Sequence, residues 1–273
     1  MFDANAFPSR RVSGIAYREA GSTHAASLTI VLLHGIGSGA ASWVQQLDAL
    51  GATRRVLAWD APGYGDSTPV APASPHAVDY ADALRGWLDA LDIERCVLVG
   101  HSLGAIIAGS FAAMHEERVA GLLLLSPAGG YGAASEEERA QKRDSRLAML
   151  AQLGPKGLAE QRSANMLSPN ASEVARDWVR WNMARIVPQG YAQATHLLAN
   201  ADLVSDVVRY CGPVSVAVGT EDRITTPHAC ERIAQAAGVP LRLIEGAGHA
   251  GYIEQPDTYN ALIGTFAQQE TKA

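Results

Sequence analysis

Cysteine is scarce in this chain, and its few copies form no pattern. Cys96, Cys211 and Cys230 are the only three, and none is part of a C-x-x-C spacing. A disulfide framework would need an even set, and a zinc site would need clustered ligands. The sequence therefore favours neither, and a chain without disulfides suits a reducing compartment. We expect a cytoplasmic protein.

Long apolar runs and an excess of basic charge are missing too. The longest apolar runs, Leu28 to Leu33 and Leu122 to Leu125, are far shorter than the ~20 residues of a membrane-spanning helix. No secretory signal is visible at the N-terminus. The formal net charge is −6, opposite to the basic footprint of a nucleic-acid-binding protein. We expect a small-molecule substrate as partner, with no nucleic acid and no membrane, and a homodimer is compatible with the sequence.

Short apolar runs recur along the chain and alternate with helical patterns. They are apolar on both faces, as in strands of a parallel sheet that helices cover on each side. The expected strands are 28–33, 55–59, 96–99, 119–125, 214–218 and 241–244, with a short antiparallel strand near 14–20. The expected helices are 41–50, 77–91, 102–114, 228–237 and 256–269. The alternation predicts an α/β fold with a doubly wound, mostly parallel sheet.

One long stretch interrupts this alternation. Residues 129–205 contain helical and charged sequence, punctuated by Pro155, Pro169 and Pro188, and no convincing strand. A single connection between strands is rarely this long. We interpret the stretch as a helical lid inserted into a core that comprises residues 1–128 and 206–273. Ordinary crossover helices are the alternative.

The strongest chemical signal is Gly100-His101-Ser102-Leu103-Gly104, which follows an expected strand and precedes an apolar helix. This is the context of the G-x-S-x-G turn, in which a strained serine is presented above the sheet. Side chains at positions 100 and 104 would collide with the neighbouring helix and strand, so glycine is needed there. The turn places Ser102 at the carboxyl ends of the strands, where ligands bind in open α/β sheets. Ser102 is the predicted nucleophile.

A serine hydroxyl is a weak nucleophile at neutral pH and needs an adjacent base. His249 is the candidate base, because it follows an expected strand through a glycine-rich turn and should reach the same sheet edge. Asp222 follows another expected strand and is the candidate that orients the imidazole, with Glu221 as a competitor. The chain order Ser102, Asp222, His249 is the order expected for this kind of turn.

Two backbone N–H groups are candidates for an oxyanion hole. Leu103, directly after the nucleophile, supplies one, and Ile36 in the glycine-rich loop 34–39 supplies the other, with Gly37 as the fallback. A glycine-rich turn without a ligand is the alternative interpretation of that loop. No cluster of ligand residues points to a metal or an organic cofactor, so we expect neither.

These motifs together resemble the lidded branch of the α/β-hydrolase family. The resemblance rests on His34–Gly37, Asp60–Ser67, Gly100–Gly104, Gly219–Asp222, and Gly248-His249 with Glu254 downstream. It implies the α/β-hydrolase fold and a catalytic triad at Ser102, Asp222 and His249. The activities it implies are those of esterases, enol-lactonases, thioesterases, perhydrolases and carbon–carbon bond hydrolases of aromatic degradation.

The residues at three positions narrow this range of activities. Epoxide hydrolases and haloalkane dehalogenases carry aspartate where this chain has Ser102, which argues against both. Carbon–carbon hydrolases usually have Asn and Trp at the positions of His101 and Ala250. We expect a serine hydrolase that cleaves an ester or lactone of a small, partly apolar carboxylic acid through an acyl-enzyme. The alternatives are carbon–carbon cleavage of a vinylogous diketone and, more remotely, a non-hydrolytic binding protein or a cofactor-free oxygenase.

The other conspicuous side chains are expected to pack. His101 should point away from the nucleophile, and the loop Asp60–Ser67 should be structural. Aromatic and methionine residues at helical spacing usually belong to the core. In the expected lid these are Trp178, Trp181 and Met183, together with Arg185.

Overall fold

An eight-stranded sheet forms the centre of the molecule. The computed structural model describes residues 3–23 and 27–270. The strand order is β1-β2-β4-β3-β5-β6-β7-β8, antiparallel at β1 and β2 and parallel from β4 to β8. The strands are β1 (Arg10–Val12), β2 (Ile15–Ala20), β3 (Thr29–Leu33), β4 (Val56–Trp59), β5 (Cys96–His101), β6 (Val119–Leu125), β7 (Val214–Gly219) and β8 (Leu241–Ile244). The predicted doubly wound, mostly parallel sheet is confirmed.

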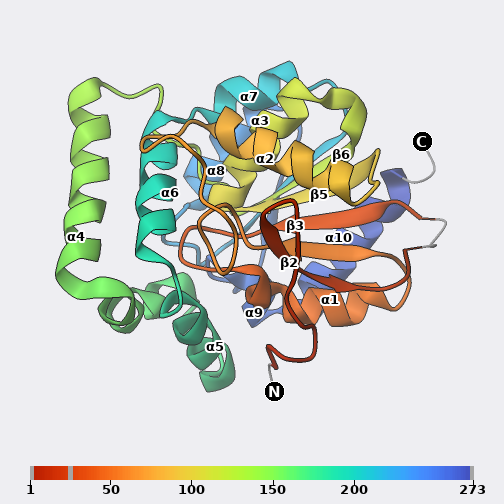
Figure 1. Ribbon diagram of the computed structural model, residues 1–273, viewed down its shortest axis with the longest axis horizontal. Coiled ribbons are helices and arrows are strands. Elements are labelled where there is room, and N and C mark those ends of the chain that lie inside the picture. The colour runs from red at the N-terminus through yellow and green to blue at the C-terminus, as the bar shows by residue number, and fades with distance from the viewer. Residues whose placement is uncertain (1–2, 24–26, 271–273) are drawn as a thin grey trace.

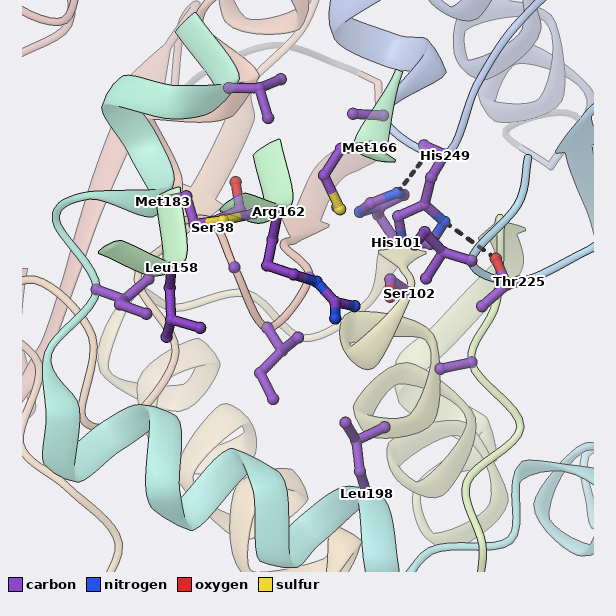
Figure 2. A pocket seen from close by; sticks show the side chains of 18 of the residues that line it. Ser38, His101, Ser102, Leu158, Arg162, Met166, Met183, Leu198, Thr225 and His249 are labelled. Atoms are coloured by element: carbon purple, nitrogen blue, oxygen red, sulfur yellow. Dashed lines mark hydrogen bonds between the residues drawn. The ribbon is translucent and has the colours of Figure 1, made fainter. Parts of the chain in front are cut away.

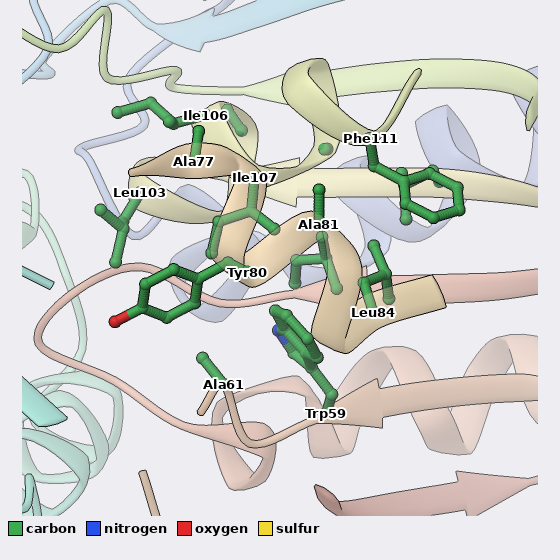
Figure 3. Close-up of a cluster of buried hydrophobic side chains, with 14 of the residues drawn as sticks. Trp59, Ala61, Ala77, Tyr80, Ala81, Leu84, Leu103, Ile106, Ile107 and Phe111 are labelled. Carbon is green, nitrogen blue, oxygen red and sulfur yellow. The ribbon is translucent and has the colours of Figure 1, made fainter. Parts of the chain in front are cut away.

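Helices cover both faces of this sheet, which explains why its central strands, β3 to β6, are largely apolar (Figure 1). Alternate residues of one strand enter different cores, as Leu122 and Leu124 do on one side and Leu123 and Leu125 on the other. Figure 3 shows part of the first core, in which Trp59, Tyr80 and Phe111 lie between helices and sheet. The flanking helices are α1 (Val44–Gly51), α2 (Ala77–Ala90), α3 (Leu103–Met114), α8 (Pro227–Ala236) and α10 (Pro256–Glu270).

Between β6 and β7 the chain is helical, as predicted, and α4, α5 and α6 stand beside the sheet domain in Figure 1. This helical insertion comprises α4 (Glu136–Arg162), the short helix Ser163–Met166, α5 (Glu173–Met183), α6 (Pro188–Asn200) and α7 (Leu203–Arg209). The expected boundary at residue 205 falls inside α7, which packs against α3. No helix of the described chain is both long enough and apolar enough to span a bilayer.

Three short elements were not predicted from the sequence. They are β1, the 3-10 helix Glu116–Arg118 and α9 (Gly251–Glu254). Each has three or four residues, too few for an apolar repeat to reveal it. Of these, α9 lies directly beside His249, and the 3-10 helix Ala40–Trp43, which opens the helix expected at 41–50, lies directly after the predicted oxyanion loop.

Candidate active site

Ser102 occupies the turn between β5 and α3 with φ 53° and ψ −114°, a conformation that residues with side chains rarely adopt. Three hydrogen bonds hold this backbone. The Ser102 N–H donates to the Leu125 carbonyl at 3.1 Å, and the Ser102 carbonyl accepts from Ala105 N–H at 3.1 Å and Ala128 N–H at 3.2 Å. The side chain lines a cavity, as expected for a nucleophile.

The two glycines of the turn are as crowded as the sequence predicts. A Cβ on Gly100 would lie 2.5 Å from the Gly104 carbonyl oxygen, and a Cβ on Gly104 would lie 2.3 Å from the Leu33 carbonyl oxygen. Both contacts are with backbone atoms, which cannot rotate away. The serine turn can therefore form only with glycine at these positions.

We expect Gly100→Ala to lower the free energy of unfolding by about 2–3 kcal/mol, because the methyl group overpacks a backbone contact. Urea denaturation measures this loss. Gly86→Ala is the matched control, since a Cβ there meets nothing within 4 Å in the middle of α2. That substitution should raise stability by about 0.5–1 kcal/mol. Equal stability of the two variants would contradict the proposed crowding.

His249 and Asp222 form a buried pair. The Nδ1 atom of His249 lies 2.9 Å from Oδ2 of Asp222, while Oδ1 of Asp222 accepts the N–H groups of Ile224 and Thr225 at 2.8 and 2.9 Å. Burial alone would raise the pKa of Asp222, but the His249 ring and these hydrogen bonds lower it to about 2. An ionised carboxylate holds the imidazole proton on Nδ1 and leaves Nε2 free to accept one.

The structure distinguishes Asp222 from its neighbour Glu221. The only charged partner of Glu221 in the described chain is Arg223, at 3.9 Å. Its carboxylate makes no hydrogen bond to His249 there. Asp222 is therefore the carboxylate that the fold brings to the imidazole.

Thr225 is a site residue that the sequence reasoning missed. Its Oγ1 lies 3.1 Å from His249 Nδ1, 2.9 Å from Asp222 Oδ2 and 2.9 Å from the Ser126 carbonyl (Figure 2). The hydroxyl can accept from Nδ1–H and donate to one of the two oxygens. Only its position three residues after Asp222 could have drawn attention to it.

His101 lies in the site instead of pointing away from it. Its Nε2 donates to the His249 carbonyl at 2.8 Å, and its ring lies 4.8 Å from the rings of both His249 and Tyr252. Burial lowers the pKa of His101 to about 3, so the ring is neutral. The expectation of packing is right, but His101 also lines the cavity and supports the His249 backbone.

The loop after β3 lies against the nucleophile. A Cβ on Gly35 would lie 3.1 Å from Cβ of Ser102, and Ile36 lines the cavity. The N–H groups of Ile36 and Leu103 donate no hydrogen bond to any other described residue. Both predicted oxyanion donors are therefore free of acceptors from the described residues, so each can donate to a substrate oxygen.

Residues 60–67 brace this loop, in the structural role expected of them. The Ala61 N–H donates to His34 Nε2 at 3.0 Å, so His34 Nδ1 carries the proton that it donates to the Gly35 carbonyl at 2.8 Å. Burial lowers the pKa of His34 to about 4 and keeps it neutral. The Tyr64 hydroxyl donates to the Ile36 carbonyl at 2.8 Å. These contacts fix the direction of the Ile36 peptide.

A cavity of about 500 Å³ lies over Ser102, between the sheet domain and the helical insertion (Figure 2). Its size suits a small-molecule substrate. The insertion contributes an apolar wall to this cavity, which consists of Met149, Leu158, Met166, Val179, Met183, Ile186 and Leu198. Met183 is thus a cavity residue, contrary to the expectation that it would only pack.

The other conspicuous side chains of α5 do pack. Trp178 is buried, and Trp181 stacks on it with ring centroids 4.7 Å apart. The Arg185 guanidinium lies 3.7 Å from the centroid of the Trp181 ring. None of these three lines the cavity.

The insertion is fastened to the His249 loop. The Ala250 N–H donates to the Met166 carbonyl at 2.7 Å. One carboxylate oxygen of Glu254 accepts the N–H groups of Gly248 at 3.0 Å and Ser168 at 3.1 Å. Glu254 thereby holds the residue before His249 and the insertion in one place.

Comparison with known proteins identifies the family of this chain. The model of the α/β-hydrolase family matches residues 30–262, so the chain belongs to that family. A putative carbamate hydrolase RutD from Pantoea ananatis is 27% identical, with 93% of each chain covered. A 2-hydroxy-6-oxononadienedioate/2-hydroxy-6-oxononatrienedioate hydrolase from Cupriavidus pinatubonensis is 29% identical, over 89% of this chain and 88% of the relative.

A solved structure is similar over its whole length. The enol-lactonase from Burkholderia xenovorans superposes with a TM-score of 0.83 at 26% identity, covering 96% of this chain and 100% of that one. The family and these relatives support a hydrolase, as the sequence predicts.

Proposed function

We propose that the protein is a serine hydrolase that cleaves an ester or lactone of a small, partly apolar carboxylic acid. One observation carries this proposal. The buried Asp222–His249 pair and the strained Ser102 meet at one cavity, beside two N–H groups without protein acceptors. Nucleophile, base, orienting acid and oxyanion donors are the groups that acyl transfer requires.

The reaction proceeds in two steps. His249 Nε2 takes the Ser102 proton as Oγ attacks the carbonyl carbon, and Asp222 stabilises the imidazolium. The N–H groups of Ile36 and Leu103 bind the oxyanion, each worth about 3 kcal/mol in the transition state. His249 then protonates the leaving alcohol, and the acyl group remains on Ser102. Water deprotonated by His249 then attacks the acyl carbon, the bond to Ser102 Oγ breaks, and His249 returns the proton to Oγ as the acid leaves.

The helical insertion acts as a lid in this proposal. Its apolar residues form the wall of the cavity opposite Ser102 and reduce access of water to the reacting groups. The hydrogen bonds of the insertion to Ala250 and Glu254 hold that wall in a fixed position relative to His249.

Carbon–carbon bond hydrolysis is the second candidate, favoured by the relative from Cupriavidus pinatubonensis. The same triad would serve it, with His249 also moving a proton on a vinylogous diketone. His101 and Ala250 stand where such enzymes usually carry Asn and Trp, so we place ester or lactone cleavage first.

Labelling with a fluorophosphonate probe tests the proposal, since it marks only an activated serine. We expect the native protein to label and Ser102→Ala not to label. Ser110→Ala, a buried serine of α3 that does not line the cavity, should label like the native protein. Absence of label on folded native protein would overturn the serine mechanism. A panel of esters, lactones and diketones then separates the two candidate reactions.

A further inference from the structure

The cavity over Ser102 is strongly cationic, although the whole chain has a net charge of −6. Its described lining contains no Asp or Glu. Four of its residues are cationic: Lys142, Arg146, Arg162 and Arg223. In a cleft with apolar walls such charges reinforce one another and attract an anion.

Arg146 and Arg162 line the cavity and have no acidic partner among the described residues, whereas the only other unpaired arginine described in the insertion, Arg185, lies on the Trp181 ring outside the cavity. Neither forms an ion pair with any residue that the structure describes, and both side chains are partly buried. Among the described residues, the Arg162 side chain makes one hydrogen bond, a long contact of 3.9 Å with the Met149 sulfur. By contrast, Arg139, Arg143, Arg176 and Arg180 pair with Glu136, Asp144, Glu173 and Asp177.

A break in α4 brings these two arginines to the same cavity. Gly154 has φ 60° and ψ 178°, which only glycine adopts readily, and Pro155 cannot donate the helical hydrogen bond. Arg146 lies before this break and Arg162 at the end of the helix after it. In Figure 2 the Arg162 guanidinium points into the cavity, toward the side where Ser102 lies.

We propose that the substrate is an ester or lactone that carries a free carboxylate, bound by Arg162 and Arg146. This inference rests on the proposed function and names the substrate class for the same site. A planar guanidinium matches a carboxylate with two parallel hydrogen bonds, and unpaired arginines supply them without first breaking an ion pair. Lys142 adds positive potential, and the apolar wall receives the carbon chain.

Two isosteric ester pairs test this assignment. In the first, the para-nitrophenyl monoester of glutarate is compared with the ester in which an isopropyl group replaces the carboxylate. In the second, the carboxylate is on the leaving group: butyrate esters of para-hydroxybenzoate and para-isopropylphenol. We expect the native protein to prefer the anionic member of at least one pair by about 10–100-fold in kcat/KM, the range of charged hydrogen bonds.

Arginine variants test which side chains bind the substrate carboxylate. Arg162→Gln should lower the ratio of kcat/KM within the preferred pair by about tenfold, and adding Arg146→Gln should abolish the preference. Arg143→Gln is the matched control. It removes the same charge from the same helix, but Arg143 pairs with Asp144 and does not line the cavity, so the ratio should stay native.

The outcomes separate this inference from the proposed function. No preference in either pair, or equal ratios in Arg162→Gln and Arg143→Gln, overturns the carboxylate assignment alone. Absence of both hydrolysis and fluorophosphonate labelling overturns the proposed function. If the fluorophosphonate labels the protein but neither ester pair is hydrolysed, calorimetric titration with glutarate decides whether the carboxylate assignment holds. Binding that Arg162→Gln abolishes supports the inference, and absent or unaltered binding overturns it.

Discussion

Asp222→Asn should lower kcat for a hydrolysed ester by about ten-thousand-fold while the fold persists. The geometry fixes how the new amide lies. Oδ1 of Asp222 accepts two backbone N–H groups, from Ile224 and Thr225, so the amide oxygen must take that place and the NH2 group must face His249. A donor opposite Nδ1 forces the imidazole proton onto Nε2, where it blocks removal of the Ser102 proton.

Glu221→Gln provides the control for this prediction. It makes the same chemical change one residue away, but Glu221 reaches only Arg223, at 3.9 Å. An exposed pair of this kind contributes little, so kcat should change by less than about threefold. Steady-state rates with para-nitrophenyl butyrate and circular dichroism of both variants make the comparison. A comparable loss in Glu221→Gln would show that Asp222 is not the orienting carboxylate.

The sequence reveals the parallel strands because helices bury both of their faces. Every residue of β6 is buried, so the run from Val119 to Leu125 is apolar without interruption. By contrast, the edge strand β1 has exposed residues and only three positions, and no periodic pattern indicates it. Elements are therefore predictable where burial is continuous over several residues, and not where they are short and one-sided.

The site residues also divide into two groups: those that a local sequence motif reveals, and those that only the tertiary structure brings together. The turn around Ser102 is encoded within five residues, because glycine is required where backbones touch. The choice of Asp222 over Glu221 depends on which side chain the β7–α8 loop turns inward. Arg146 and Arg162 are far apart in sequence, and only the break at Gly154 brings them to one cavity.

The second large effect is a loss of stability in mild acid. His34 and His101 are buried and neutral in the fold, with pKa values lowered by burial to about 4 and about 3. The unfolded chain takes up protons on both rings near pH 6.5, the usual pKa of histidine. Between about pH 6.5 and pH 4 the unfolded state therefore binds more protons, and stability falls as the pH falls.

Asp60 opposes this trend in part. Burial raises its pKa to about 6, so the folded state binds the extra proton as the pH falls below that value. At pH 4 each histidine has lowered the stability by about 3 kcal/mol and Asp60 has raised it by about 2, so these three groups together lose about 4 kcal/mol relative to pH 6.5. Typical domains have only about 5–15 kcal/mol in total, so the protein should be close to unfolding at pH 4.

Urea denaturation at pH 7 and at pH 4 measures this loss, and His101→Gln identifies its source. Glutamine can still donate to the His249 carbonyl, but it does not titrate, so the net acid loss should shrink from about 4 to about 1 kcal/mol. His228→Gln is the matched control, because that side chain is exposed on α8 and its removal leaves both buried rings in place. Native protein equally stable at pH 7 and pH 4 would mean that the two rings accept protons in the fold, which their closed surroundings oppose. An acid loss that His101→Gln leaves intact would move the cause to His34, whose Nε2 must release the Ala61 N–H before it can be protonated.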